Sequence, residues 1–134
     1  MHNTSQPTTN MNVLSQKLSE VIEGDVSFEP HTLGIYATDA SLYQMTPVGV
    51  VCPKHDADVI SAVRIAADHG VTILPRGGGT SLAGQTVGHS LVLDFSKYMN
   101  QLLELNVEEK WVRVQPGMVR DELNRELKKH GLLF

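Results

Sequence analysis

The sequence predicts an α+β fold, with a small sheet that contains a parallel βαβ unit, a β-hairpin and flanking helices. Strand, helix and strand patterns follow one another between residues 48 and 74. Two further apolar runs with a polar connection lie near the C-terminus, which is typical of a hairpin. Amphipathic helical periodicity precedes and follows these strands. A chain of 134 residues is long enough for one domain with a modest core.

The first third of the chain carries one clear helical signal. Residues 1–10 are polar, and we expect them to be disordered. Apolar residues recur at spacings of three and four over residues 11–23, which predicts a short amphipathic helix that ends at Gly24. Residues 26–46 show no sustained period, and we expect their centre, residues 36–43, to form an ordered loop or a single helical turn.

The strongest signal is the strand, helix and strand that follow. Residues 48–52 form an apolar strand, and a helix is expected over residues 56–69 with Asp56 as its N-cap and Gly70 as its stop. Residues 71–74 form the next strand, so we expect the two strands to be parallel with a right-handed crossover. The apolar helix face expected to pack on the sheet consists of Val59, Ile60, Val63, Ala66 and Ala67.

The C-terminal part reads as three strands and a helix. A strand at 91–95 precedes a hairpin of residues 102–105 and 111–115, whose buried face should carry Val112 and Val114. Pro116-Gly117 ends the hairpin, and a helix is expected over residues 118–130 before Gly131. Its apolar positions are Val119, Leu123 and Leu127.

The feature that points to function is the segment 74–85, Leu-Pro-Arg-Gly-Gly-Gly-Thr-Ser-Leu-Ala-Gly-Gln. Each ordered glycine costs about 0.5–1 kcal/mol of chain entropy relative to alanine, and it adds no side chain to a core. Glycines instead let a ligand approach the main chain, whose free N–H groups can bind phosphate. A tight turn is the structural alternative. The neighbouring Arg76, Thr80 and Ser81, and the position after a parallel strand, favour an anion site.

Two familiar phosphate motifs do not fit this segment. Residues 79–86 differ from a P-loop at one position, because Gln85 stands where the phosphate-binding lysine belongs. A P-loop also runs into a helix, whereas the strand at 91–95 follows here. The dinucleotide pattern G-x-G-x-x-G fails because Leu82 occupies the place of its last glycine.

Composition excludes several other classes of protein. The hydrophobic fraction of 41% is that of a globular chain, and the net charge of −4 without a basic cluster argues against nucleic-acid binding. Six scattered histidines show no metal-ligand spacing. A single cysteine, Cys52, rules out an internal disulfide and favours a reducing compartment. No apolar run of about 18 residues and no signal peptide are present, so we expect a cytoplasmic protein without a membrane span.

Several spaced motifs resemble the FAD-linked oxidases of the vanillyl-alcohol oxidase and p-cresol methylhydroxylase (PCMH) type. The glycine segment from Arg76 follows Val-Val-Cys-Pro-Lys and precedes Leu-Val-Leu-Asp-Phe-Ser-Lys. The glycolate oxidase and D-lactate dehydrogenase branch is the most similar, through Tyr36-Ala-Thr-Asp-Ala-Ser, Met99-Asn, Val114-Gln-Pro-Gly and Asp121-Glu-Leu-Asn. The resemblance extends over residues 36–134.

The resemblance implies that residues 11–134 form the first lobe of a PCMH-type FAD-binding domain. The chain would be an N-terminal fragment, cut before a second lobe and a substrate-binding cap domain, and its exposed apolar ending at residues 132–134 suggests the same. The implied cofactor-binding residues are Arg76, Gly77, Gly78, Gly79, Thr80, Ser81, Gln85, Pro116 and Gly117. Thr80 replaces the histidine that links flavin in covalent members, so FAD should be bound non-covalently.

The function implied is that of an FAD-dependent oxidoreductase acting on a 2-hydroxy acid such as D-lactate or glycolate. The catalytic residues of the family lie in the parts that follow, so none is assigned to this chain, and the chain alone should be inactive. The alternative is a stand-alone phosphate- or nucleotide-binding module without redox activity. A purely structural domain would bind no ligand at all.

Overall fold

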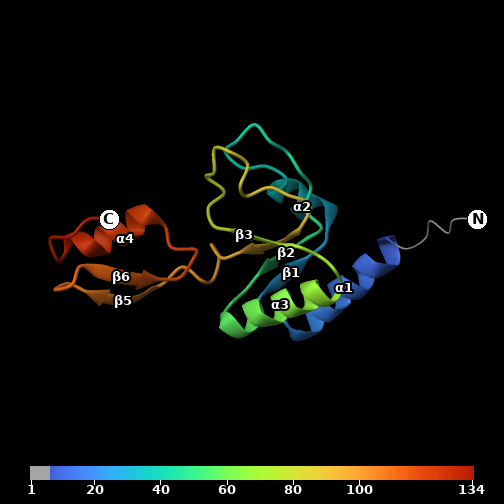
Figure 1. Cartoon of the computed structure of the whole chain (residues 1–134), viewed down its shortest axis with the longest axis horizontal. Coiled ribbons are helices and arrows are strands. Elements are labelled where there is room, and N and C mark those ends of the chain that lie inside the picture. The colour runs from blue at the N-terminus through green and yellow to red at the C-terminus, as the bar shows by residue number, and fades with distance from the viewer. Residues whose placement is uncertain (1–6) are drawn as a thin grey trace, which may run out of the picture.

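The computed structural model describes residues 7–134, with side chains from residue 10 onward, and Figure 1 shows two regions. We call residues 7–99 the sheet region and residues 100–134 the hairpin region. The sheet region contains α1 (Pro7–Val21), β1 (Asp25–Ser27), α2 (Pro30–Tyr36), β2 (Gly49–Cys52), α3 (Asp56–Asp68), β3 (Ile73–Arg76) and β4 (Leu91–Asp94). The hairpin region contains β5 (Leu102–Asn106), β6 (Trp111–Val114) and α4 (Arg120–Lys128).

The sheet region is a four-stranded sheet in the order β1-β2-β4-β3. The predicted parallel βαβ unit is confirmed, since β2 and β3 both run parallel to β4. However, β4 lies between them, so the two strands of the unit are not hydrogen-bonded to each other. β1 pairs antiparallel with the outer side of β2.

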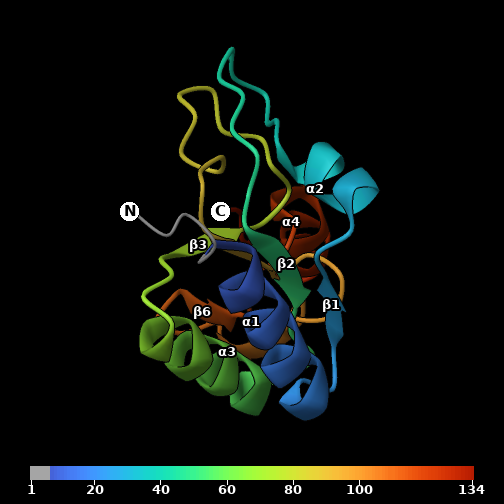
Figure 2. The same cartoon turned by 90° about the vertical axis from the view of Figure 1, so that its right-hand side faces the viewer.

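Helices cover both faces of this sheet, which is why its central strands are apolar apart from Asp94 (Figure 2). On one face, α1 and α3 pack together and onto the alternate strand residues Val51, Leu91 and Leu93. On the other face, α2 packs onto Val50, Cys52 and Val92. Every residue of β2 and β4 is buried. Burying a valine or leucine side chain completely stabilises the folded state by about 1.5–3 kcal/mol.

Two elements of the sheet region were not predicted. β1 has only three residues and is stabilised by its register with β2, in which Asp25 lies opposite Cys52. α2 has seven residues, begins with Pro30 and contains Gly34, so its sequence carries little helical periodicity. Short elements of this kind depend on their neighbours rather than on their own residues.

The two longer helices differ from the prediction at their ends. α1 begins at Pro7, because proline suits the first turn of a helix. Residues 7–10, which were expected to be disordered, are therefore helical, and the rest of that expected segment lies outside the described residues. The N-cap of α3 is His55, not Asp56, and its side chain accepts a hydrogen bond from the Asp58 amide.

The buried face of α3 also differs from the predicted one. Ala62 and Ala66 are fully buried, whereas Ile60 and Val63 are 51% and 43% exposed. Ala62 and Ala66 lie in the core shared with α1, so the face of α3 that packs inward is the one that carries these small residues.

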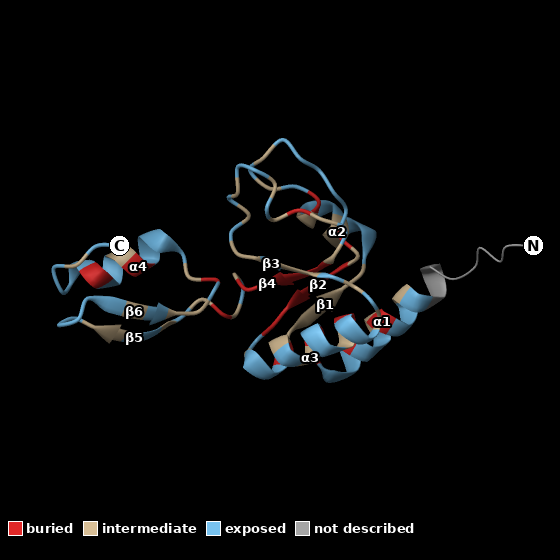
Figure 3. Cartoon of the chain, viewed as in Figure 1, coloured by how far each residue is buried: buried red, intermediate tan, exposed pale blue. Residues whose placement is uncertain are grey.

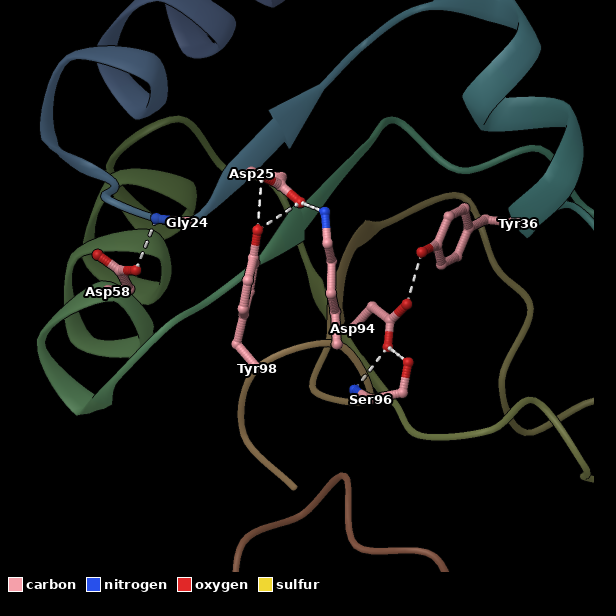
Figure 4. Close-up of polar contacts among 8 residues, drawn as sticks. Gly24, Asp25, Tyr36, Asp58, Asp94, Ser96 and Tyr98 are labelled. Carbon is pink, nitrogen blue, oxygen red and sulfur yellow. Dashed lines mark hydrogen bonds and ion pairs between the residues drawn. The ribbon is translucent and has the colours of Figure 1, made fainter. Parts of the chain in front are cut away.

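Asp58 joins three segments of the sheet region. Its side chain is buried and accepts hydrogen bonds from the backbone amides of Glu23, Gly24 and Lys54 at 2.9, 3.0 and 2.9 Å (Figure 4 shows the bond to Gly24). Burial alone would raise the pKa of Asp58, but these three donors together hold it below its ordinary value.

The hairpin region consists of the antiparallel pair β5 and β6 with α4 beside it. The predicted hairpin is confirmed, with Val112 and Val114 half-buried. Leu123 and Leu127 of α4 are buried, but Val119 is 52% exposed and lies before the helix as its N-cap. Among the helices of residues 7–134, none is long and apolar enough to cross a membrane.

Candidate functional site

A pocket of about 430 Å³ lies where the glycine loop meets the segment before α4. Five of the predicted site residues line it, together with Ser96, Met118 and the start of α4. These five are Gly77, Gly78, Thr80, Pro116 and Gly117. A neighbouring hollow of about 440 Å³ between β5 and α4 shares Met118 but contains none of the predicted residues.

Sheet topology explains why the glycine loop reaches this pocket. β3 and β4 are neighbouring parallel strands in which Arg76 lies opposite Asp94, and the amide of Phe95 donates to the carbonyl of Arg76 at 3.0 Å. The glycine loop and the segment after Asp94 therefore leave the same edge of the sheet. This edge, at the carboxyl ends of parallel strands, is where open α/β sheets bind ligands.

Packing within the chain does not require glycine at positions 77 and 78. A Cβ atom on Gly77 would lie 3.7 Å from the nearest atom, the Pro116 carbonyl oxygen, and one on Gly78 would lie 3.7 Å from Thr80 Cγ2. Neither residue has a positive φ. Both face the pocket, so a side chain at either position would take up space open to a ligand.

Gly79, in contrast, is required by the loop itself. Its φ is +67°, and an added Cβ would lie 2.5 Å from Arg76 Nη2. The turn at Gly79 thus brings the loop back over Arg76. The three consecutive glycines thus serve two purposes: Gly79 allows the turn of the loop, whereas Gly77 and Gly78 leave space in the pocket.

The Arg76 side chain lies outside the pocket lining and braces the surrounding loops. Its guanidinium donates to the carbonyl oxygens of Tyr36, Thr86 and Thr38 at 3.3, 3.1 and 2.8 Å. It also stacks 5.2 Å from the centre of the Tyr36 ring. Arg76 therefore fixes the position of the glycine loop through segments distant in the sequence.

Ser81 and Gln85 also lie outside the pocket lining. Their side chains are hydrogen-bonded to each other, and Ser81 Oγ accepts from the Gln85 amide at 3.2 Å. The loop is further held by Asp39, whose carboxylate accepts from Thr86 Oγ1 at 2.9 Å. Hydrogen bonds from Ser41 and Thr86 lower the pKa of Asp39 to about 2.

The opposite wall of the pocket is formed by Pro116, Gly117 and the residues that begin α4. Gly117 donates to the carbonyl of Met99 at 2.9 Å, and an added Cβ would lie 2.1 Å from the carbonyl oxygen of Phe95. The glycine at 117 is thus required by contact between the two regions. The positive end of α4 faces this wall, although Asp121 there carries a negative charge.

Sequence reasoning missed a polar cluster behind the pocket, formed by Tyr36, Asp94 and Ser96 (Figure 4). Tyr36 donates to the buried carboxylate of Asp94 at 2.5 Å. Burial and the adjacent carboxylate raise the pKa of Tyr36 well above its usual value, so its hydroxyl stays protonated. The rule that placed the glycine loop could have found Ser96, because Ser96 also follows the carboxyl end of a parallel strand.

The described residues hold no group of three or more His, Cys, Asp or Glu side chains arranged to bind a metal ion. The polar groups at the pocket are backbone amides, hydroxyls, a helix N-terminus and the charged residues Arg120 and Asp121. This donor set suits a phosphate-bearing organic ligand.

Comparisons with known proteins agree with this chemistry. Residues 47–134 match a family described as FAD binding domain. The chain is 42% identical over 115 residues to D-2-hydroxyglutarate dehydrogenase of Haemophilus influenzae. The aligned part covers 84% of this chain and 11% of that protein. It is 35% identical over 118 residues to the glycolate oxidase subunit GlcD of Bacillus subtilis, covering 84% and 25%. The structure of p-cresol methylhydroxylase with substrate bound matches with a TM-score of 0.74 at 19% identity, covering 93% of this chain and 26% of that one.

The fold and the family match define a cofactor-binding domain. The chain belongs to the FAD-binding domain family. The resemblance drawn from the sequence motifs and the PCMH-type α+β fold are both confirmed. The chain spans about 11% of the length of the D-2-hydroxyglutarate dehydrogenase that it matches.

Proposed function

We propose that this chain is the first lobe of the FAD-binding domain of an oxidoreductase that acts on a small 2-hydroxy acid. Family membership supports the cofactor. The names of the relatives, a D-2-hydroxyglutarate dehydrogenase and a glycolate oxidase subunit, support the substrate class, since both substrates are 2-hydroxy acids. The second lobe and the cap domain would be further parts of the same polypeptide, and the lone Cys52 supports a cytoplasmic location.

The observation that carries the proposal is the open backbone at Gly77 and Gly78. Both glycines line the pocket, neither adds a side chain to it, and the chain itself gives no packing reason for glycine there. The pyrophosphate of FAD would lie against Gly77, Gly78 and Thr80, with Pro116 and Gly117 as the opposite wall. Arg76, Gly79, Ser81 and Gln85 would act by shaping the loop.

The chain's own residues would bind and orient the cofactor, which supplies the redox chemistry when bound. Thr80 has no ring nitrogen that could bond to the flavin, so the binding would be non-covalent. We assign no catalytic residue to this chain. A few backbone hydrogen bonds contribute about 0.5–1.5 kcal/mol each, whereas micromolar affinity needs about 8 kcal/mol, so the isolated chain should bind FAD more weakly than micromolar.

Backbone amide NMR suits such weak binding in a chain of 14.7 kDa. Titration with FAD should shift the amide resonances of Gly77, Gly78 and Thr80. Gly78→Val should keep the dispersed spectrum of a folded chain and lose these shifts, because the new side chain occupies the phosphate space. Gly34→Val is the matched control, since a Cβ at Gly34 meets nothing within 4 Å and Gly34 lies in α2, outside the pocket lining.

Parallel titrations with ATP and inorganic phosphate separate the two functional hypotheses. An FAD domain should bind FAD more tightly than either, whereas a general phosphate-binding module should bind ATP equally well. Equal FAD binding by Gly78→Val and Gly34→Val would refute the assignment of the loop.

A further inference from the structure

Ser96 forms part of the pocket wall beside the glycine loop. It lies two residues beyond Asp94, which is in register with Arg76, so it leaves β4 next to the point where Gly78 leaves β3. A serine beside a phosphate cradle is ordinarily expected to donate its hydroxyl hydrogen to a phosphate oxygen. The hydrogen bonds of Ser96 do not permit this.

Both donors of Ser96 are already used by a buried carboxylate (Figure 4). The Ser96 amide and the Ser96 hydroxyl donate to the same oxygen of Asp94, at 2.8 and 2.6 Å. The other oxygen of Asp94 accepts from Tyr36, which fixes the carboxylate from the far side. Ser96 is therefore held in one orientation, and only the lone pairs of its oxygen remain for a ligand.

The buried negative charge of Asp94 also makes Ser96 unsuited to bind an anion. Asp94 is only 7% exposed. Lys97 pairs with Asp25 and Arg76 binds backbone carbonyls, whereas Arg120 stands in the pocket lining at the start of α4. An anion placed against Ser96 would meet an oxygen whose donors are already bonded to the Asp94 carboxylate. The pocket lining thus combines the backbone of Gly77 and Gly78 with Ser96, whose oxygen can only accept hydrogen bonds.

We propose that Ser96 is a positioning residue that accepts a hydrogen bond from a sugar hydroxyl next to the cofactor diphosphate. This inference rests on the proposed function, because FAD carries hydroxyls on both sides of its diphosphate, on the ribityl chain and on the ribose. Asp94 and Tyr36 act through Ser96 by holding its oxygen toward the pocket. Ser96 would set the direction in which the cofactor lies along the cradle.

The test compares probes with and without a sugar on the wild-type chain and on Ser96→Ala, by the amide shifts of Gly77 and Gly78. The probes are FAD, ADP, FMN and inorganic pyrophosphate. Loss of one hydrogen bond should weaken FAD binding about 2- to 12-fold and leave pyrophosphate binding unchanged. If Ser96→Ala weakens the binding of ADP but not of FMN, the partner of Ser96 is the ribose. If it weakens the binding of FMN but not of ADP, the partner is the ribityl chain. Ser96→Thr, which keeps the hydroxyl, should restore FAD affinity.

Ser90→Ala is the matched control, because the hydroxyl of Ser90 is bonded to Thr72 and lies outside the pocket lining. Should Ser96→Ala lack a folded spectrum, Ser96→Cys takes its place. Equal weakening of FAD and pyrophosphate, or no weakening of FAD, overturns the inference while leaving the proposed function in place. If no probe moves the glycine amides of the wild-type chain, the proposed function fails and this inference fails with it.

Discussion

The sheet region and the hairpin region are built from similar elements but packed very differently (Figure 3). In the sheet region every residue of β2 and β4 is buried, and helices cover both faces. In the hairpin region no residue of β5 or β6 is fully buried, and α4 contributes two buried leucines, Leu123 and Leu127. A two-stranded hairpin with one helix is marginal as an independent unit.

The candidate pocket lies on the boundary between these regions, which explains its character. The glycine loop is anchored on the well-packed sheet, whereas Pro116 and Gly117 belong to the sparsely packed part. The regions are joined where the Gly117 amide donates to the Met99 carbonyl at 2.9 Å. One wall of the site should therefore be preformed, and the other should gain order when a ligand bridges the two.

We expect the largest loss of stability from a substitution in the core of the sheet region. Leu91 is fully buried in β4, so Leu91→Ala should lower the free energy of unfolding by about 3–5 kcal/mol through lost burial and a cavity. Leu123→Ala in α4 should cost about 2 kcal/mol, at the lower end of the range for such a change, because the half-buried residues around it can collapse into the space. Urea unfolding followed by circular dichroism measures both.

Hydrogen exchange gives the regional control for this pair. Leu123→Ala should accelerate exchange in β5, β6 and α4 and leave the amides of β2 and β4 protected. Equal costs for the two substitutions would mean that the hairpin region is packed as well as the sheet region.

The next effect concerns pH, and we expect it to be concentrated in the sheet region. The folded-state pKa of Asp58 lies below its ordinary value of 3.8, so its contribution is present above that pH and is lost as pH falls through the folded value. Asp58→Asn should cost about 2 kcal/mol at pH 7 and flatten the decline in stability below pH 4, as measured by urea unfolding at several pH values.

The hairpin region supplies the control for Asp58. The ion pair between Arg113 and Glu104 is 66% and 51% exposed, and exposed pairs contribute about 0–1 kcal/mol. Glu104→Gln should therefore change the pH profile little. A profile in which Glu104→Gln matches Asp58→Asn would contradict this division of the acid sensitivity.

How far the sequence predicts the molecule follows from the same difference between local and distant causes. The sequence predicted α3, the strands β2 and β4, and the hairpin, because each has an apolar pattern set by residues close together in the sequence. The insertion of β4 between β2 and β3 was not, since strand order depends on non-local pairing. The exposed Ile60 shows the same limit, because its position depends on the contact between α3 and α1.

The site was predictable to a similar extent. The glycine loop was found from composition and from its place after a strand. The bracing role of Arg76 and the acceptor-only state of Ser96 were not, because both depend on partners such as Tyr36 and Asp94 that lie far away in the sequence. Backbone freedom can be inferred from glycines, but hydrogen-bond direction requires the partner.

The smallest expected effect tests whether the hairpin region behaves as a separate unit. Asn124 holds the C-terminal segment against α4, since its side chain accepts from the Phe134 amide at 2.8 Å and donates to the Phe134 carbonyl at 3.2 Å. Both bonds are exposed to solvent, so Asn124→Ala should lower global stability by less than about 1 kcal/mol. The amides of Leu132 and Phe134 should exchange faster, because Leu132 bonds to Leu127 only while the segment stays on the helix. Protection at Val51 and Leu93 should be unchanged, as these residues belong to the core of the sheet region. Faster exchange at Val51 and Leu93 as well would show that both regions unfold as one cooperative unit, and the ligand would then find both walls of the pocket equally preformed.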